Sequence, residues 1–466
     1  MNNYRIEIEP FGLVTLLTFS GKQEVNEHGY IEFSGTIPQD MEAEYLYIGR
    51  SSTEVTIYAV DMSGEWEIWF KGIIISLEIK SDIEVKTIYV TAKTYSYLMD
   101  VSPHTRSYQT PSMTYNTVLA SYTTSYPGGD FMMKQGDGTP IKDLILQYRE
   151  TDWEYTKRLA SHFKTVLLPD YKVGGTKYYF GITQSAPVAA IDTGIYNIKK
   201  DAVEYDRKKK NGLDVHESDA TYHIYRTREM YTLGNCITLN GEPLYISKIE
   251  TELRGSEVYH TYYMKPLNGF KIRKDHNTQT IGASFHANIT DVERDIVKIS
   301  IQKDENQAGC GSRWFPYSTV YSTPDGTGWY AMPEIGDAVR MYIPNEDEAE
   351  AYVISATHLE SSDTSERINP DFKSIMNKYK KEVLFKPDAL IITNNNGMSI
   401  ELFDDFGINI ISDKAIFIQS EEAFNMISTQ STITVTAEES IIMHQANTKT
   451  ELMENIAFEG AKIHLD

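Results

Sequence analysis

The chain has 466 residues, 41% of them hydrophobic and 32 of them tyrosine, which is enough for about three packed domains. Its 66 acidic and 44 basic residues give a net charge of −22, which argues against nucleic acid or an anionic membrane surface as the main partner. Two cysteines, Cys236 and Cys310, are too few for a disulfide framework or a cysteine-based metal cluster.

Residues 1–110 alternate apolar and polar side chains in short runs, which predicts the strands of a first hub β-barrel. The abundance of Tyr, Thr and Ile in the whole chain favours a mainly β fold. The first residues contain neither the basic nor the apolar region of a signal peptide, and no stretch approaches 18 consecutive apolar residues. We therefore expect synthesis in the cytoplasm without a signal peptide, and no membrane span.

Residues 111–168 are predicted to form a small helical insert. A short helix is expected after the Ser or Thr of 112–114, and a helical pattern resumes at 139–148. The strongest pattern is QYRETDWEYTKRLASHF, residues 147–163, in which the Thr-Asp pair at 151–152 offers an N-cap.

Two spacings support a helix in this stretch. Tyr155, Leu159 and Phe163 recur every four residues and would form one apolar face. Glu154 and Arg158 are also four residues apart, which favours an ion pair on the helix surface. From these residues alone we expect a short amphipathic helix that caps a barrel.

Strand patterns return after the insert. Residues 169–280 predict a second hub barrel, and residues 281–360 hold about five short strands that suit an OB-type barrel. Residues 361–388 are polar and charged, with a short helical pattern at 370–382, and are interpreted as a linker.

From residue 389 to 466, apolar residues come in pairs spaced two apart, and the pairs recur about every eight residues, with a lapse near 449–451. A repeat this short cannot cover its own apolar face. Three chains could close a triangular prism, so we expect an intertwined homotrimeric β-prism, a trimeric β-helix, with a monomeric solenoid or a fibre-like sheet as alternatives. The residues predicted to form the trimer core are Ile408, Ile410, Ile416, Ile418, Ile433, Val435, Ile441, Ile456 and Phe458.

The order of these parts resembles the VgrG family and the T4-type hub and spike of contractile phage tails. Residues 147–159 are similar to the family's signature in the hub insert, Gln-Tyr-x-Glu-(Ser/Thr)-Asp-x-x-aromatic-x-x-Arg-Leu. The matching residues are Gln147, Tyr148, Glu150, Asp152, Tyr155, Arg158 and Leu159. Residues 106–110 resemble the family's Arg-x-aromatic-Gln, residues 328–358 its OB segment, and residues 392–410 the start of its spike.

This resemblance implies a structural homotrimer. Its hub, residues 1–280, would have quasi-sixfold symmetry and would dock under an inner tube protein and baseplate wedge proteins. The OB-type units would form a collar. The prism would contact the target envelope transiently. A PAAR-like protein could cap the tip. The particle would be a virion, a type VI secretion system or a phage tail-like particle, and the compact length resembles the spike of an R-type bacteriocin released from the cell. We expect neither a lysozyme domain before the prism nor a fused toxin after it.

Catalytic motifs are absent from the sequence. There is no HExxH or GxSxG, and GDGTP at 136–140 lacks the Lys-Ser/Thr of a phosphate loop. His464 could reach a metal ion on the trimer axis, but period two sends it outward if Ile463 and Leu465 point inward, so no metal or cofactor is expected. We expect a mechanical part and no enzyme. The alternatives are a tail-associated cell-wall hydrolase, a polysaccharide-binding spike or a receptor-binding fibre.

Overall fold

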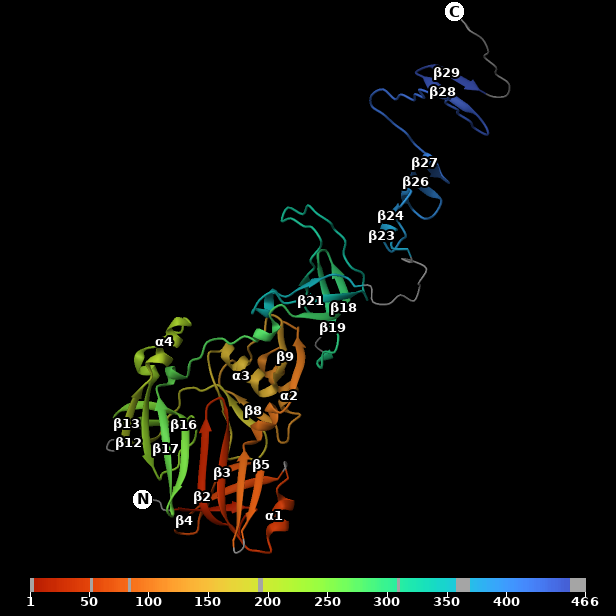
Figure 1. The fold of residues 1–466 in the computed structure, drawn as a ribbon. Helices are drawn as coiled ribbons and strands as arrows, with labels where there is room; N and C mark the ends of the chain where they lie inside the picture. Colours follow the sequence, from red (N-terminus) through yellow and green to blue (C-terminus); the bar gives the residue numbers. More distant parts are fainter. Residues whose placement is uncertain are drawn as a thin grey trace, which may run out of the picture. The chain divides into compact units, whose positions relative to one another are not determined.

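The computed structural model describes residues 4–50, 53–82, 85–191, 196–307, 311–357 and 369–452. The chain forms two compact units, residues 1–360 and 361–466, which are described separately. The fold is mainly β, as predicted (Figure 1). Among the residues described, no helix is long and apolar enough to span a bilayer.

The largest element of the first unit is a 12-stranded sheet with the order β1-β4-β5-β6-β3-β2-β16-β17-β14-β13, to which β15 and β12 are added beside β16. Its N-terminal strands are β1 (Tyr4–Glu9), β2 (Thr15–Glu24), β3 (Glu27–Ile37), β4 (Glu54–Asp61), β5 (Trp66–Ser81) and β6 (Lys86–Lys93). The later strands are β12 (Pro187–Ile191), β13 (Tyr196–Lys200), β14 (Thr221–Thr227), β15 (Cys236–Leu239), β16 (Glu242–Arg254) and β17 (Glu257–Lys265).

The two predicted barrels are halves of this one sheet. They join where β2 pairs with β16, with Gly21 opposite Thr251, and they share one hydrophobic core. Every second residue of the strands tends to be buried, most clearly in β17, where buried and half-buried residues alternate, because one face of each strand lines the core. The sheet curls until β1 approaches β17, where the Tyr4 hydroxyl hydrogen-bonds His260. Helices α1 (Glu42–Ile48) and α4 (Ala202–Lys210) lie in its connections.

The insert has its own core, built on α2 (Tyr115–Thr123) and α3 (Asp152–His162). Strands β7 (Pro103–Tyr108) and β9 (Ile145–Thr151) pair with each other, and β10 (Leu167–Pro169), β11 (Lys177–Phe180) and β8 (Asp130–Met133) form a small sheet. Helix α2 begins after Thr114, whose side chain accepts a hydrogen bond from the Thr117 amide, so the short predicted helix is confirmed.

The helical pattern at 139–148 was misleading. Residues 145–151 are the strand β9, and α3 starts only at Asp152. Ile145 packs in the insert core, whereas Leu144 and Leu146 pack in the core of the next sheet. A strand buried on both faces carries a continuous apolar run, which its sequence cannot distinguish from part of a helix.

That next sheet forms a module with five strands in the order β20-β19-β18-β21-β22. They are β18 (Ser284–Glu293), β19 (Ile296–Ile301), β20 (Phe315–Pro316), β21 (Ala338–Tyr342) and β22 (Tyr352–Ile354), with the short 3₁₀ helix η6 (Glu348–Glu350) before β22. We call residues 284–357 the five-stranded module.

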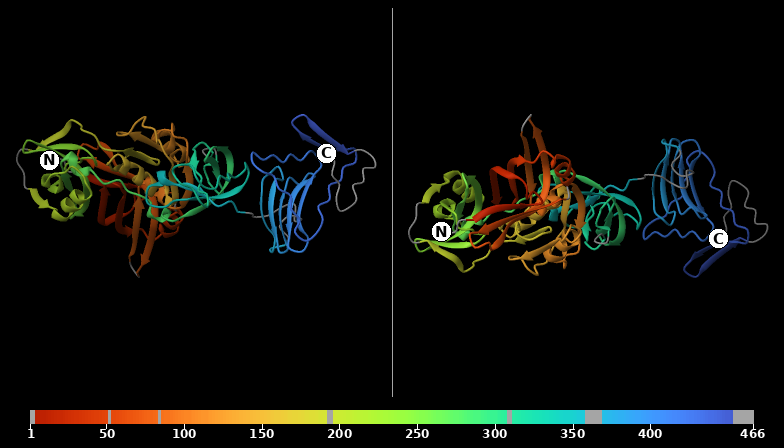
Figure 2. Two further views of the ribbon diagram at one scale, coloured as in Figure 1. Left: turned by 90° about the horizontal axis from the view of Figure 1, so that it is seen from above. Right: turned by 90° about the horizontal axis from the view of Figure 1, so that it is seen from below.

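The second unit contains another five-stranded antiparallel sheet, whose strands lie side by side in Figure 2. They are β23 (Lys373–Met376), β24 (Glu382–Lys386), β25 (Ala389–Thr393), β26 (Met398–Phe403) and β27 (Gly407–Ser412), and a hairpin of β28 (Ile441–Gln445) and β29 (Thr448–Leu452) follows. The helix expected at 370–382 is therefore wrong. The Asn377 side chain accepts hydrogen bonds from the amides of Tyr379 and Lys381, which closes a turn between two strands.

Candidate functional site

Helix α3 is fixed at its start by a reciprocal cap. The Thr151 hydroxyl accepts a hydrogen bond from the Glu154 amide at 3.1 Å, and Glu154 Oε2 accepts one from the Thr151 amide at 2.9 Å. Glu154 therefore serves the cap, and the predicted ion pair between Glu154 and Arg158 is wrong. Tyr155 and Leu159 of the predicted apolar face are fully buried in the insert core, with Phe163 packed against it.

Arg158 turns away from the helix surface into a buried network. Its Nε and Nη2 donate to the two carboxylate oxygens of Glu150 at 2.8 and 2.7 Å, and Nη2 also donates to the Leu146 carbonyl at 2.7 Å. Its Nη1 reaches Glu348 of η6 at 3.0 Å, and the other Glu348 oxygen accepts from the Leu146 amide. Arg158 thus ties the insert to the five-stranded module through fully buried charged hydrogen bonds.

A second network surrounds the first turn of α3. Arg106 of β7 hydrogen-bonds Asp152, and its Nη1 also donates to Gln147 Oε1 at 3.0 Å. Gln147 Nε2 donates to Asp152 Oδ1 at 2.9 Å, and the Tyr126 hydroxyl donates to Asp152 Oδ2 at 2.7 Å. Burial and the neighbouring Asp152 raise the pKa of Tyr126. The signature residues therefore brace one another across β7, β9 and α3.

The same strands hold the module at a second place. The Ser107 amide donates to Asp304, the Glu305 amide donates to the Thr105 carbonyl at 3.1 Å, and His104 Nδ1 hydrogen-bonds Glu305 at 2.7 Å. Tyr148 packs edge-on against Phe285 of β18, with ring centroids 4.9 Å apart. Of the residues that match the family signature, Arg158 and Tyr148 thus join the insert to the five-stranded module.

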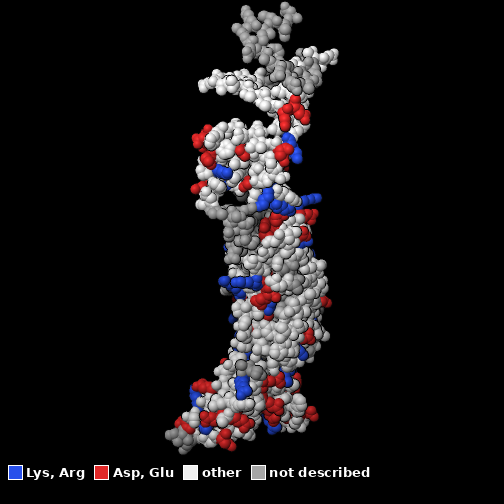
Figure 3. Space-filling view, turned by 90° about the vertical axis from the view of Figure 1, so that its right-hand side faces the viewer, with Lys and Arg blue, Asp and Glu red and all other residues white. Residues whose placement is uncertain are grey.

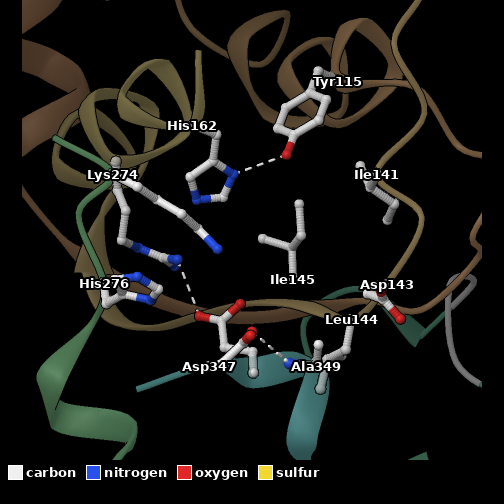
Figure 4. A pocket seen from close by; sticks show the side chains of 12 residues that line it. Tyr115, Ile141, Asp143, Leu144, Ile145, His162, Lys274, His276, Asp347 and Ala349 are labelled. Carbon is white, nitrogen blue, oxygen red and sulfur yellow. Dashed lines mark hydrogen bonds and ion pairs between the residues drawn. The ribbon is translucent and has the colours of Figure 1, made fainter. Parts of the chain in front are cut away.

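A cavity of about 190 Å³ lies beside Arg158, between the insert, the connection at 274–276 and η6 (Figure 4). His162 points into it and its Nδ1 hydrogen-bonds the Tyr115 hydroxyl at 2.8 Å. Burial, together with the positive charge of Arg158 and Lys274, lowers the pKa of His162 to about 3, so this histidine is neutral. Glu348 in its wall is engaged by Arg158, and Asp347 accepts from the Ala349 amide.

No metal centre is evident in the described ranges, and the one face drawn in Figure 3 shows no basic patch. No group of three His, Cys, Asp or Glu side chains there could hold a metal ion. On the face drawn in Figure 3, Lys and Arg are scattered among Asp and Glu and form no continuous patch. His464, the candidate tip ligand, lies outside the described residues.

The sheet of the second unit carries an uncovered apolar face. One cross-strand row runs Ile375–Val383–Ile392–Ile400–Ile410, and the next runs Lys373–Phe385–Leu390–Leu402–Ile408. Period two places both rows on the same face. Ile408 and Ile410 remain 69% and 59% exposed, so this face lacks the cover that an apolar sheet face requires.

Beyond this sheet the chain is extended but unpaired. Between Lys414 and Ser440, within the described part, no backbone hydrogen bond joins the chain to another segment, although bends recur near 421, 430 and 438. Ile416, Ile418, Ile433 and Val435 are each at least half exposed. Ile441 begins β28, whereas Ile456 and Phe458 lie outside the described residues. Burial of these residues in a trimer core stays a prediction.

Sequence reasoning missed two parts of this arrangement. Glu348 is 190 residues from Arg158 and no motif connects them. The apolar rows begin in β23 and β24, in the predicted linker. Their sequences, KSIM and EVLFK, show no clear alternation of apolar and polar residues and stand among lysines, so the pattern did not indicate strands.

Comparisons with known proteins place the fold. No family model matches the chain, and no curated protein matches it by sequence. A chain of the half-lidded Francisella PdpA–VgrG complex superposes with a TM-score of 0.56 at 10% identity over 88% of each chain, and a chain of the lidless complex gives the same TM-score over 88% of this chain and 98% of the other.

The E. coli c3393 protein, described as a type VI secretion system component with structural similarity to the T4 tail proteins gp27 and gp5, superposes with a TM-score of 0.53 at 13% identity. It covers 75% of this chain and 99% of its own. At these identities the likeness concerns the fold. The resemblance expected from the sequence is confirmed at that level, because the chain has the fold of VgrG-like and T4-type hub proteins.

Proposed function

We propose that this protein is the homotrimeric hub and spike of a contractile injection system, a mechanical part without catalytic activity. The observation that carries the proposal is the extended, unpaired chain between Lys414 and Ser440. Backbone N–H and C=O groups are rarely left without partners in a folded segment. The described residues of this unit, 369–452, supply no such partners, and in our proposal other copies of the same chain supply them.

A trimer satisfies both features of the second unit. Three sheets can bury their apolar rows against one another, and three extended segments can wind together and pair their backbones. Each isoleucine that becomes buried contributes about 2 kcal/mol, before the entropic cost of ordering the chain. Each repeat of about eight residues, from one bend to the next, would then form one side of the prism.

The first unit supplies a stiff base. The buried network at Arg158 joins its insert to the module, and the Trp153 indole of the insert donates to the Asn26 carbonyl between β2 and β3, so force on the hub reaches the module without a flexible joint. We assign the five-stranded module to an OB-type collar and the large sheet to a hub of two pseudo-equivalent halves. Three copies present six such halves, which suits docking beneath a hexameric tube.

This assignment gives the partners and the setting. The hub would contact the inner tube protein and baseplate wedge proteins, and a PAAR-like protein could cap the spike. The chain would be assembled into a phage tail, a phage tail-like bacteriocin or a type VI secretion apparatus. The spike would cross the target envelope when a sheath contracts.

The decisive test changes the predicted prism core. The triple variant I408D/I416D/I433D should be monomeric by size exclusion with light scattering, because three charges per chain cannot be buried on the axis. The matched control N409D/Q419D/T434D adds the same charge at neighbouring positions of opposite strand parity and should stay trimeric. A trimeric mass for the triple variant, or a monomeric mass for the unaltered protein, would contradict the proposal.

A further inference from the structure

One exposed feature of the five-stranded module is not explained by the proposed function. Residues 318–331, between β20 and β21, form an ordered hairpin that leaves the sheet as a long loop in Figure 1. We call it the aromatic hairpin. Its most exposed large side chains are Val320, Tyr321, Trp329 and Tyr330.

The aromatic hairpin is held in shape by its own hydrogen bonds. The Trp329 amide donates to the Tyr321 carbonyl at 2.8 Å, and the Thr323 amide donates to the Thr327 carbonyl at 2.9 Å. At the tip, Asp325 Oδ1 accepts from the Thr327 amide at 2.9 Å. Gly328 has φ 144° and a Cβ there would come within 2.4 Å of the Tyr321 carbonyl oxygen, so the close turn requires glycine.

Its apolar side chains nevertheless remain in solvent. Val320 is 87% exposed, Tyr330 75% and Trp329 58%. Tyr330 is oriented by a hydrogen bond from its hydroxyl to the Arg294 carbonyl at 2.9 Å, which leaves its ring outside the module. Ordered Trp and Tyr side chains of this kind are the residues that dominate binding energy at protein interfaces.

Charge indicates which partner covers them. The chain carries −22, so two copies that meet through typical surface repel each other. Between Trp314 and Pro333 the single charged residue is Asp325, and its carboxylate is engaged in the turn. Through the aromatic hairpin, a copy of this chain can therefore touch another without opposing like charges.

The proposed trimer also brings copies together. The connection between β22 and β23 is 18 residues long, residues 355–372. Because three modules would be tethered to the same prism, the effective concentration of each module around the others would be high. Resting on the trimer of the proposed function, we infer that the aromatic hairpin is an arm that packs on a neighbouring copy of this chain. It would lock the three modules together around the base of the spike.

The experiment uses the full-length protein with the photoreactive residue benzoylphenylalanine in place of Val320. Light scattering first establishes the mass, and irradiation should then join two chains covalently. The control carries the same residue in place of Gln302, an exposed position of the same module, and should give at least tenfold less two-chain product. A second measurement is chymotrypsin cleavage after Trp329 and Tyr330, which should be at least tenfold slower in the trimer than in the monomeric I408D/I416D/I433D variant.

The outcomes separate the two proposals. A trimer that crosslinks from Val320 and not from Gln302 supports the arm. A trimer with no two-chain product, or with equal product from both positions, overturns the arm and leaves the hub-spike function standing. A crosslink to a different tail protein in intact particles assigns the aromatic hairpin to that protein instead, and a monomeric mass overturns both proposals.

Discussion

At the scale of single residues, Arg158 joins the insert to the five-stranded module. It is 4% exposed and satisfies two carboxylates on opposite sides of a domain junction, Glu150 and Glu348. Desolvation opposes a buried charge, but the two glutamates outweigh it and raise the pKa of Arg158 overall. A planar guanidinium can meet both carboxylates and the Leu146 carbonyl at once, whereas a lysine ammonium cannot.

We therefore expect Arg158→Lys to lower the free energy of unfolding of the first unit by about 3 kcal/mol, since it leaves buried carboxylates underpaired. Urea denaturation followed by tryptophan fluorescence measures it, because Trp153 lies in the insert core. Arg149→Lys, at an exposed position near the end of β9, is the matched control and should change stability little. Equal effects of the two variants would mean that the network contributes nothing.

A buried histidine gives the fold a dependence on pH. His260 lies in the core of the large sheet between Tyr4 and Thr251, and burial, assisted by the positive charge of Lys172, lowers its pKa to about 3. An unfolded histidine titrates near 6.5, so the unfolded chain binds more protons as the pH falls. The stability associated with neutral His260 is complete above pH 6.5 and is lost progressively towards pH 3.

The melting temperature should consequently fall between pH 6.5 and pH 5, where the buried carboxylates with lowered pKa values, such as Glu204 at about 2, still remain ionised. His260→Gln should make this fall shallower, whereas His286→Gln, on an exposed strand position, should leave its slope unchanged. Thermal melts across this pH range measure both. Parallel curves for the His260 variant and the unaltered protein would contradict the assignment.

How far single residues could be predicted depended on the distance of their partners. The signature around α3 was recognisable because its members lie within 13 residues of one another. The partner choice of Arg158 was predicted wrongly because four-residue spacing makes Glu154 the local candidate, while the true partners come from β9 and from η6. Local spacing cannot reveal a contact that only the folded junction creates.

At the scale of elements, α3 shows how a short local signal places a helix. Its first residue follows the Thr151 cap, which the Thr-Asp pair at 151–152 predicted to within one position. Strand β9 shows the opposite case. Its side chains enter two cores, so the alternation that identifies a half-exposed strand is absent. The apolar residues of this segment therefore predicted a helix.

The cap is open to a direct test. Thr151→Ala removes the hydroxyl that accepts from the Glu154 amide and should destabilise the first unit by about 1 kcal/mol. Thr151→Ser retains the hydroxyl, so its loss of stability should be at most a small part of the loss in the alanine variant. Both values come from urea denaturation. A loss from the serine variant as large as that from the alanine variant would mean that methyl packing, and not the cap, matters at this position.

At the scale of the whole molecule, the sequence predicted the class of fold better than its partition. A mainly β chain with a helical insert and a repetitive C-terminal part is what the structure contains. The strand patterns fall into two blocks and predict two hub barrels, and in the structure β2 and β16 pair across the two blocks. Such long-range pairing leaves no local mark, since either strand would show the same alternation at the edge of a barrel.

The charge of the assembled molecule leads to a final prediction. Three copies of a chain with net charge −22 bring 3 × 22 = 66 negative charges together. In the second unit, acidic pairs stand at the bends, Glu421 with Glu422 and Glu438 with Glu439, and all four are exposed. In a prism, each bend of one chain lies near the equivalent bends of two others, so these carboxylates repel across the trimer.

Salt screens repulsion between exposed charges, since the Debye length falls from about 10 Å at 0.1 M to about 3 Å at 1 M. The temperature at which trimers dissociate should therefore rise between 0.05 M and 0.5 M NaCl, as followed by light scattering during heating. The variant E421Q/E422Q/E438Q/E439Q should dissociate at a higher temperature in low salt and respond less to added salt. Four glutamines at unrelated acidic positions of the hub, in E32Q/E65Q/E67Q/E78Q, provide the control for net charge. An equal gain from that control would assign the effect to net charge and not to the bends of the spike.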